Sequence, residues 1–297
     1  MGLSDRLIDQ RSPDRRPRRA AYALPTLFTA GSIFLGYLSI LRSFRGAMMA
    51  ATGGDAAAAD HFAIAAKAIV AAALLDGLDG RIARMTNTAS AFGREMDSLA
   101  DVISFGIAPA VLAFAWGVQF LDTSLAPSVR GQLFNTGYFV AFLFLLCGAV
   151  RLARFNVQKN PIPKNPGRPD RKYFVGLPIP AAAGMVAAVV YASGAEPISW
   201  WPLSVAWLGL LALLGFLMVS TWRYHSFKGV NLSKPYTPLI IVVVGGFIYA
   251  VWNYGQPVLL ALMTAYVASG IAIRIGGLVR RRWRRAAPPP VPEHPVV

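Results

Sequence analysis

Long runs of apolar residues dominate this chain, and short polar segments separate them. About eight such runs can be marked, most of them close to 20 residues long, the length at which a helix crosses the hydrocarbon core of a bilayer. They cover approximately residues 23–41, 62–83, 98–120, 135–153, 174–193, 200–220, 236–253 and 256–275. The pattern predicts an all-α fold, a polytopic membrane bundle of about eight transmembrane helices.

Composition supports the membrane assignment. The mean hydropathy is +0.48, and only 14% of the residues are charged, against about 25% in soluble domains. The net charge of +15 would suggest a nucleic-acid partner in a soluble chain. Here 25 of the 29 Lys and Arg residues fall in the N-terminal tail, the C-terminal tail and alternate loops. Cytoplasmic segments of membrane proteins accumulate such residues. The chain is therefore predicted to lie in the cell (inner) membrane, with both termini cytoplasmic and no nucleic-acid partner.

Four aspartates interrupt the apolar pattern at the cytoplasmic ends of the second and third segments. They form two stripes at helical spacing together with very small residues. The first stripe comprises Asp76, Asp79, Gly80 and Ala83, and the second comprises Ser90, Gly93, Asp97, Asp101 and Ser104. Because both helices end at the same membrane face, all four carboxylates are expected at one depth. The small residues leave room for a bulky charged substrate.

Such a group of carboxylates needs neutralising charges. An ionised carboxylate costs roughly 2.5–3.5 kcal/mol near the centre of a membrane helix and less near its ends. One interpretation is a set of Asp–Arg pairs with Arg81, Arg84 and Arg94 that stabilises a helix hairpin. The other is a metal site, because all-oxygen clusters suit Mg²⁺ or Mn²⁺. Two such ions can clamp a reacting phosphoryl group, and four interleaved carboxylates favour this second interpretation.

The spacing of these residues resembles the signature of the CDP-alcohol phosphatidyltransferases. The matching order is Asp76-x2-Asp79-Gly80-x2-Ala83-Arg84-x8-Gly93-x3-Asp97-x3-Asp101. The resemblance implies six core membrane helices and the exchange of CMP on a CDP-linked lipid for an alcohol. Four regions follow from it: a basic arm at 1–21, a catalytic core at 22–220, two additional transmembrane helices at 221–276, and a basic, then Pro-rich, cytosolic tail at 277–297.

The resemblance also assigns roles to individual residues. Asp76, Asp79, Asp97 and Asp101 would hold two divalent cations, Mg²⁺ or Mn²⁺, and Asp101 would also act as the general base on the incoming hydroxyl. A second group would contact the CDP moiety. This group comprises Gly80, Ala83, Arg84, Ser90 and Gly93. Members of the family often form homodimers, so the resemblance allows a homodimer, although no residue pattern here marks a dimer face.

The acceptor alcohol is predicted from segments outside the signature. "DSLADVISFGIAPA", "RLARFNV" and "YFVGLPIPAAAG" resemble the phosphatidylserine synthase branch of the family. This similarity implies CDP-diacylglycerol and L-serine as substrates, with phosphatidylserine and CMP as products. Thr26 and Ser32 depart from that branch, because relatives often have Asn at these positions. The alternatives are a sibling enzyme that uses glycerol 3-phosphate, inositol phosphate or choline, and a cation transporter.

Two arginines at the cytosolic end of the fourth segment are candidates for recognising the substrates. Arg151 or Arg154 could bind the serine carboxylate or the phosphate of the lipid donor. The alternative is that both are interfacial anchors whose guanidinium groups reach the lipid headgroups.

Overall fold

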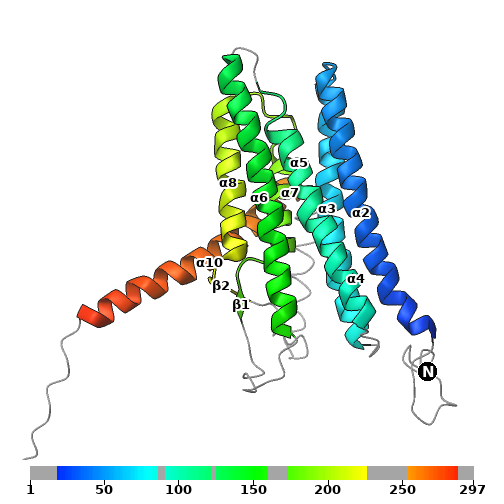
Figure 1. Cartoon of the computed structure of the whole chain (residues 1–297), viewed down its shortest axis with the longest axis vertical. Coiled ribbons are helices and arrows are strands. Elements are labelled where there is room, and N and C mark those ends of the chain that lie inside the picture. The colour runs from blue at the N-terminus through cyan, green and yellow to red at the C-terminus, as the bar shows by residue number, and fades with distance from the viewer. Residues whose placement is uncertain (1–18, 86–90, 122–124, 160–172, 226–252, 287–297) are drawn as a thin grey trace, which may run out of the picture.

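The structure is a computed structural model that describes residues 19–85, 91–121, 125–159, 173–225 and 253–286 (Figure 1). The statements below refer to these residues. The helices are α2 (Arg19–Ala51), α3 (Asp55–Met85), α4 (Ala91–Asp101), the π-helix η1 (Val102–Ile107), α5 (Ala108–Gly117), α6 (Pro127–Lys159), α7 (Ile179–Ala192), α8 (Trp201–Val219) and α10 (Gly255–Ala286). Two short strands are β1 (Tyr173–Val175) and β2 (Arg223–His225).

The predicted membrane bundle is confirmed. Within the described ranges, 6 helical stretches are long and apolar enough to cross a membrane. The apolar helix α7 is shorter, with 14 residues. All of the predicted segment 236–253 except its last residue lies outside the described residues, so the total of eight transmembrane helices stays a prediction. The last segment extends further than expected, because α10 continues to Ala286 and includes the start of the predicted tail.

The helices surround α7. Helix α2 packs along α3, α5 packs against α2 and α6, and α6 packs against α8. Helix α7 contacts α3, α5, α8 and α10. Its residues 182–188 are all buried, and most of them are alanine or glycine, so neighbouring backbones can approach closely, as is common between membrane helices. Helix α10 crosses the others obliquely and extends away from the bundle (Figure 1).

The fifth predicted segment does not begin as a helix. Residues 173–175 form strand β1, which pairs antiparallel with β2, with Phe174 opposite Tyr224. Gly176 follows with a φ of +80°, a conformation that favours glycine. Pro178 then precedes the first residue of α7 and disfavours helical backbone at the residue before it. The apolar run from 174 therefore divides into a strand, a turn and a helix.

The third predicted segment, 98–120, is also not one regular helix. It divides into α4, η1 and α5, and the backbone N–H of Ala108 donates to the carbonyl of Ile103, a bond spanning five residues. Pro109 lies in the first turn of α5, and it lacks the N–H that a continuous α-helix would need there. The wider π turn is the local response, and such turns are frequent at functional sites.

Gly36 allows α2 to lie directly on η1. A Cβ at Gly36 would be 2.6 Å from Oγ of Ser104 and 2.8 Å from its Cα, while the Ser104 hydroxyl donates to the carbonyl of Ser32 at 2.9 Å. We therefore expect Gly36→Ala to destabilise the protein by about 1–3 kcal/mol, measured as a lower thermal midpoint in detergent. Gly209→Ala is the control, because nothing lies within 4 Å of a Cβ there. Equal midpoints for the two variants would contradict this packing.

Candidate active site

The carboxylates lie at one end of the bundle. The last turns of α3, the first turns of α4 and the last turns of α6 reach the same end (Figure 1). Asp76 lies on α3, Asp97 lies on α4, and Asp101 is the last residue of α4, directly before η1. Two helices thus supply acidic groups, and α6 supplies Arg151 beside them.

Asp101 is at the centre of this group. Its carboxyl is in hydrogen-bond contact with that of Asp76, and it also interacts with the charges of Asp97 and Arg151. Oδ1 of Asp101 is buried and receives no hydrogen bond from the described residues. The structure therefore brings the carboxyls of Asp76 and Asp101 into contact, within range of the charge of Asp97, and Oδ1 of Asp101 has no donor among the residues that the structure describes.

The chemistry of these donors fits a divalent cation. Two carboxylates in direct contact repel one another unless a proton or a cation lies between them. Hard cations such as Mg²⁺ prefer carboxylate oxygens, and Oδ1 of Asp101 is a carboxylate oxygen that lacks a hydrogen-bond partner among the described residues. However, no three His, Cys, Asp or Glu side chains of the described residues already converge as a metal site. Since the side chain of Asp79 is outside the described part, the two-ion arrangement remains a prediction.

The predicted CDP contacts are placed only in part. Gly80, Ala83 and Arg84 lie in the last two turns of α3, but their side chains are outside the described part, and Ser90 lies outside the described residues. Gly93 is half-buried in the first turn of α4. The positions of Gly80, Ala83, Arg84 and Gly93 share the end of the bundle that holds the aspartates.

The two candidate arginines have different partners in the structure. Arg151 is buried, its Nε has no hydrogen-bond partner among the described residues, and its guanidinium interacts with the charge of Asp101. Arg154 instead donates to the carbonyl of Val219 at 3.1 Å and to that of Val175 at 3.3 Å. Arg154 thus joins α6 to the end of α8 and to β1, whereas Arg151 faces the carboxylates.

Two tyrosines, Tyr266 beside Arg151 and Tyr224 next to Tyr266, could not be found from the sequence. Tyr266 of α10 interacts with Arg151, and its ring centroid lies 5.8 Å from that of Tyr224 in β2. The hydroxyl of Tyr224 is buried without a partner in the described ranges. Its burial, and then the neighbouring Tyr266, raise the pKa of Tyr224 to about 12, so it remains a protonated donor at neutral pH. No local motif marks these residues, because Tyr266 meets Arg151, and Tyr224 meets Tyr266, only through the tertiary fold.

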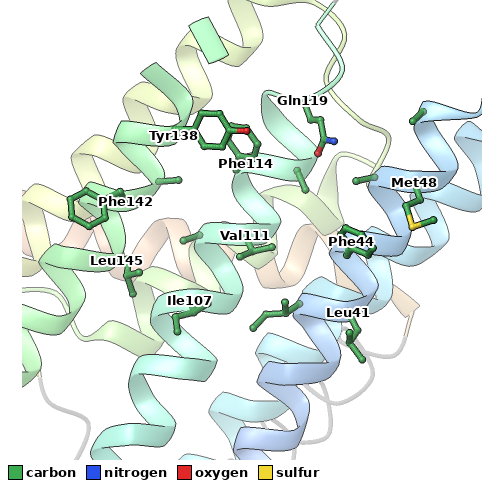
Figure 2. Close-up of a pocket in the computed structure, with 16 residues that line it drawn as sticks. Leu41, Phe44, Met48, Ile107, Val111, Phe114, Gln119, Tyr138, Phe142 and Leu145 are labelled. Atoms are coloured by element: carbon green, nitrogen blue, oxygen red, sulfur yellow. The ribbon is translucent and has the colours of Figure 1, made fainter. Parts of the chain in front are cut away.

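A large cavity of about 720 Å³ lies elsewhere, between α2, α5 and α6. Figure 2 shows aromatic and aliphatic side chains facing it, among them Phe44, Phe114 and Phe142. No acidic or basic side chain lines it. This cavity offers no group for phosphoryl chemistry, so the candidate active site is the group of carboxylates and not this cavity.

Comparison with known proteins agrees with the signature. The family model described as CDP-alcohol phosphatidyltransferase matches residues 22–222. A CDP-diacylglycerol–serine O-phosphatidyltransferase of Helicobacter pylori strain J99 is 37% identical over 256 residues, which cover 86% of this chain and 92% of the relative. An archaetidylserine synthase of Methanothermobacter thermautotrophicus is 34% identical over 71% of this chain and 73% of its own length. The chain therefore belongs to the CDP-alcohol phosphatidyltransferase family.

Proposed function

We propose that this membrane enzyme transfers the phosphatidyl group of CDP-diacylglycerol to L-serine and releases CMP. The observation that carries the proposal is the buried, unsatisfied oxygen of Asp101 beside Asp76, Asp97 and Arg151. It provides a base, metal-binding oxygens and a cation at one point of the bundle. The Helicobacter pylori relative, which matches along most of the chain, carries the name of this reaction.

In the proposed mechanism, Asp101 accepts the proton of the serine hydroxyl. The serine oxygen attacks the phosphorus that bears the diacylglycerol, the bond from that phosphorus to the CMP oxygen breaks, and CMP leaves. A positioned carboxylate base of this kind contributes about 10²–10⁴-fold to a rate. Asp76, Asp79 and Asp97, with Asp101, would hold two Mg²⁺ or Mn²⁺ ions. When bound, these ions would neutralise the charge of the pyrophosphate.

The remaining candidates bind and orient the substrates. Arg84 would pair its planar guanidinium with the pyrophosphate, while Gly80, Ala83, Ser90 and Gly93 would leave space for the cytidine and ribose. We assign Arg151 to the carboxylate of serine, since it is buried and its Nε has no partner in the described part of the chain. Arg154 already donates to two backbone carbonyls, so we assign it a structural role.

The proposed location is the inner membrane, with both termini and the active site on the cytoplasmic side. The concentration of Lys and Arg in the tails and alternate loops supports this orientation. The lipid donor would then reach the site from the inner leaflet and serine from the cytoplasm. We retain residues 22–220 as the catalytic core and 221–276 as an addition to it, although Tyr266 of the addition lies beside Arg151.

The test is CMP release from the purified protein with CDP-diacylglycerol and Mn²⁺ or Mg²⁺. Serine, glycerol 3-phosphate, inositol phosphate and choline are supplied one at a time. We expect release that depends on serine and on the metal, and that stops when EDTA is added. Release with another alcohol but not with serine would identify a sibling enzyme. No release with any alcohol, together with cation flux in vesicles, would favour a transporter.

A further inference from the structure

Tyr266 reaches the surroundings of Arg151 from outside the part of the chain that matches the family model. That match ends at residue 222, whereas Tyr266 lies on α10. Tyr266 nevertheless interacts with Arg151, the arginine that we assign to the carboxylate of serine. The mechanism proposed above does not use Tyr266, so its position beside a substrate-binding arginine needs an explanation.

The surroundings of Arg151 leave hydrogen-bonding capacity for a ligand. Cζ of Arg151 lies over the ring of Phe155, 5.7 Å from the ring centroid, so an apolar group covers one face of the guanidinium. The charge of Asp101 acts on it as well. Nε of Arg151 is buried and has no hydrogen-bond partner in the described ranges. Because buried N–H groups are nearly always paired, an anionic ligand beside Arg151 would supply an acceptor that the described residues do not.

Packing against β2 holds Tyr266 in place. Its ring centroid lies 5.8 Å from that of Tyr224, which is fully buried. Gly270, one turn further along α10, lies against the same ring, because a Cβ at Gly270 would overlap it. The strand that pairs with β2 is joined to α6 by Arg154, which donates to the carbonyl of Val175 at 3.3 Å. These contacts hold the part of α10 that carries Tyr266 close to Arg151.

We propose that the hydroxyl of Tyr266 binds the carboxylate of the acceptor together with Arg151. The inference rests on the proposed function, in which serine is the acceptor. A carboxylate has about four acceptor positions, so it can bind the guanidinium and also accept a hydrogen bond from the tyrosine hydroxyl. The serine hydroxyl can then reach Asp101, which also interacts with Arg151. In this arrangement α10 contributes to the choice of acceptor, while the part that matches the family model carries the reaction.

The experiment compares L-serine with L-serinamide, which keeps the hydroxyl and the amino group but lacks the carboxylate. CMP release is measured with the purified full-length protein, CDP-diacylglycerol and Mn²⁺. We expect Tyr266→Phe to raise the KM for L-serine roughly tenfold, as for the loss of one hydrogen bond to a charged group. The KM for CDP-diacylglycerol and the rate with L-serinamide, a weaker acceptor, should not change. The matched control is Tyr138→Phe on α6, roughly 20 Å before Arg151 along that helix, and it should leave all three values unchanged.

A second variant displaces Tyr266 without removing its hydroxyl. Gly270→Ala places a methyl group against the ring of Tyr224, so α10 must shift, and the KM for L-serine should rise while L-serinamide is used as before. Gly276→Ala on the same helix is the control, because nothing lies within 4 Å of a Cβ there. The two glycine variants therefore differ only in whether the added methyl group meets β2.

The outcomes separate this inference from the proposed function. An unchanged KM for L-serine in Tyr266→Phe, or equal losses with L-serine and L-serinamide, would overturn the role of Tyr266. A higher KM for CDP-diacylglycerol alone would also overturn it, because the hydroxyl would then bind the lipid phosphate. Failure of the proposed function appears in the unaltered protein, as CMP release that does not depend on serine, and would refute both.

Discussion

Asp101→Asn is expected to lower the rate of CMP release by roughly 10²–10⁴-fold, the usual contribution of a positioned general base. Asparagine has a similar shape, but it cannot accept the hydroxyl proton and it offers one oxygen instead of two. Oδ1 of Asp101 has no protein donor in the described ranges, so the substitution breaks no protein hydrogen bond at that atom. The initial rate at saturating serine and CDP-diacylglycerol measures the effect.

Thermal stability separates catalysis from folding in this variant. Asp101 lies against the carboxyl of Asp76 and near that of Asp97, so removing its charge relieves repulsion between like charges. We expect the thermal midpoint without metal to be equal to or higher than that of the unaltered enzyme. Asp60→Asn is the matched control, because Asp60 is exposed on α3 and far from Asp76 along that helix. If the Asp101→Asn enzyme retained the full rate, Asp101 would not be the general base.

Arg151→Lys is expected to lower kcat/KM for serine by roughly 10–100-fold, mainly through a higher KM. Lysine keeps the positive charge opposite Asp101 but loses the planar fork that binds a carboxylate with two parallel hydrogen bonds. Hydrogen bonds to charged groups contribute about 1.5–3 kcal/mol, which corresponds to this range. Steady-state kinetics with serine and CDP-diacylglycerol varied separately measure the two KM values.

Arg154→Lys is the matched control for Arg151→Lys. Arg154 donates to the carbonyls of Val219 and Val175, so its substitution should lower the thermal midpoint and leave the KM for serine unchanged. If Arg151→Lys raises the KM for CDP-diacylglycerol instead, the guanidinium binds the lipid phosphate. If both variants raise the KM for serine equally, the distinction between the two arginines is wrong.

Features that depend on local spacing could be predicted from the sequence. The lengths of the apolar runs predicted the membrane helices, because a bilayer sets the length of a span. Asp76 and Asp101 were expected to meet because both lie at the same membrane face, and their carboxyls are in contact. Arg151 and Arg154, three residues apart on one helix, could not be separated in this way. Their different partners come from other elements, β1, α8 and α10 among them.

Breaks within apolar segments were missed for a related reason. Residues 98–120 and 174–193 are both mainly apolar, but the backbone changes conformation within both segments. Pro109, Gly176 and Pro178 are the residues that mark these breaks. A search for proline and glycine inside the predicted spans would have found the candidates, but not the type of turn that each produces. The contact of Tyr266 with Arg151 depends on how α10 crosses the bundle, which its own sequence does not specify.

The π turn η1 changes the rotational phase of the third span. One extra residue in a helix with 3.6 residues per turn rotates everything beyond it by about 100°. The residues before η1 can therefore direct Asp97 and Asp101 toward α3 and α6. The residues after η1 pack their alanines against α2 and α7, and the carbonyl of Ala113 accepts a hydrogen bond from Nε1 of Trp207 on α8 at 3.0 Å. A regular α-helix could orient only one of these two faces correctly. The π turn therefore allows one segment to combine the packed helix α5 with the aspartates of α4.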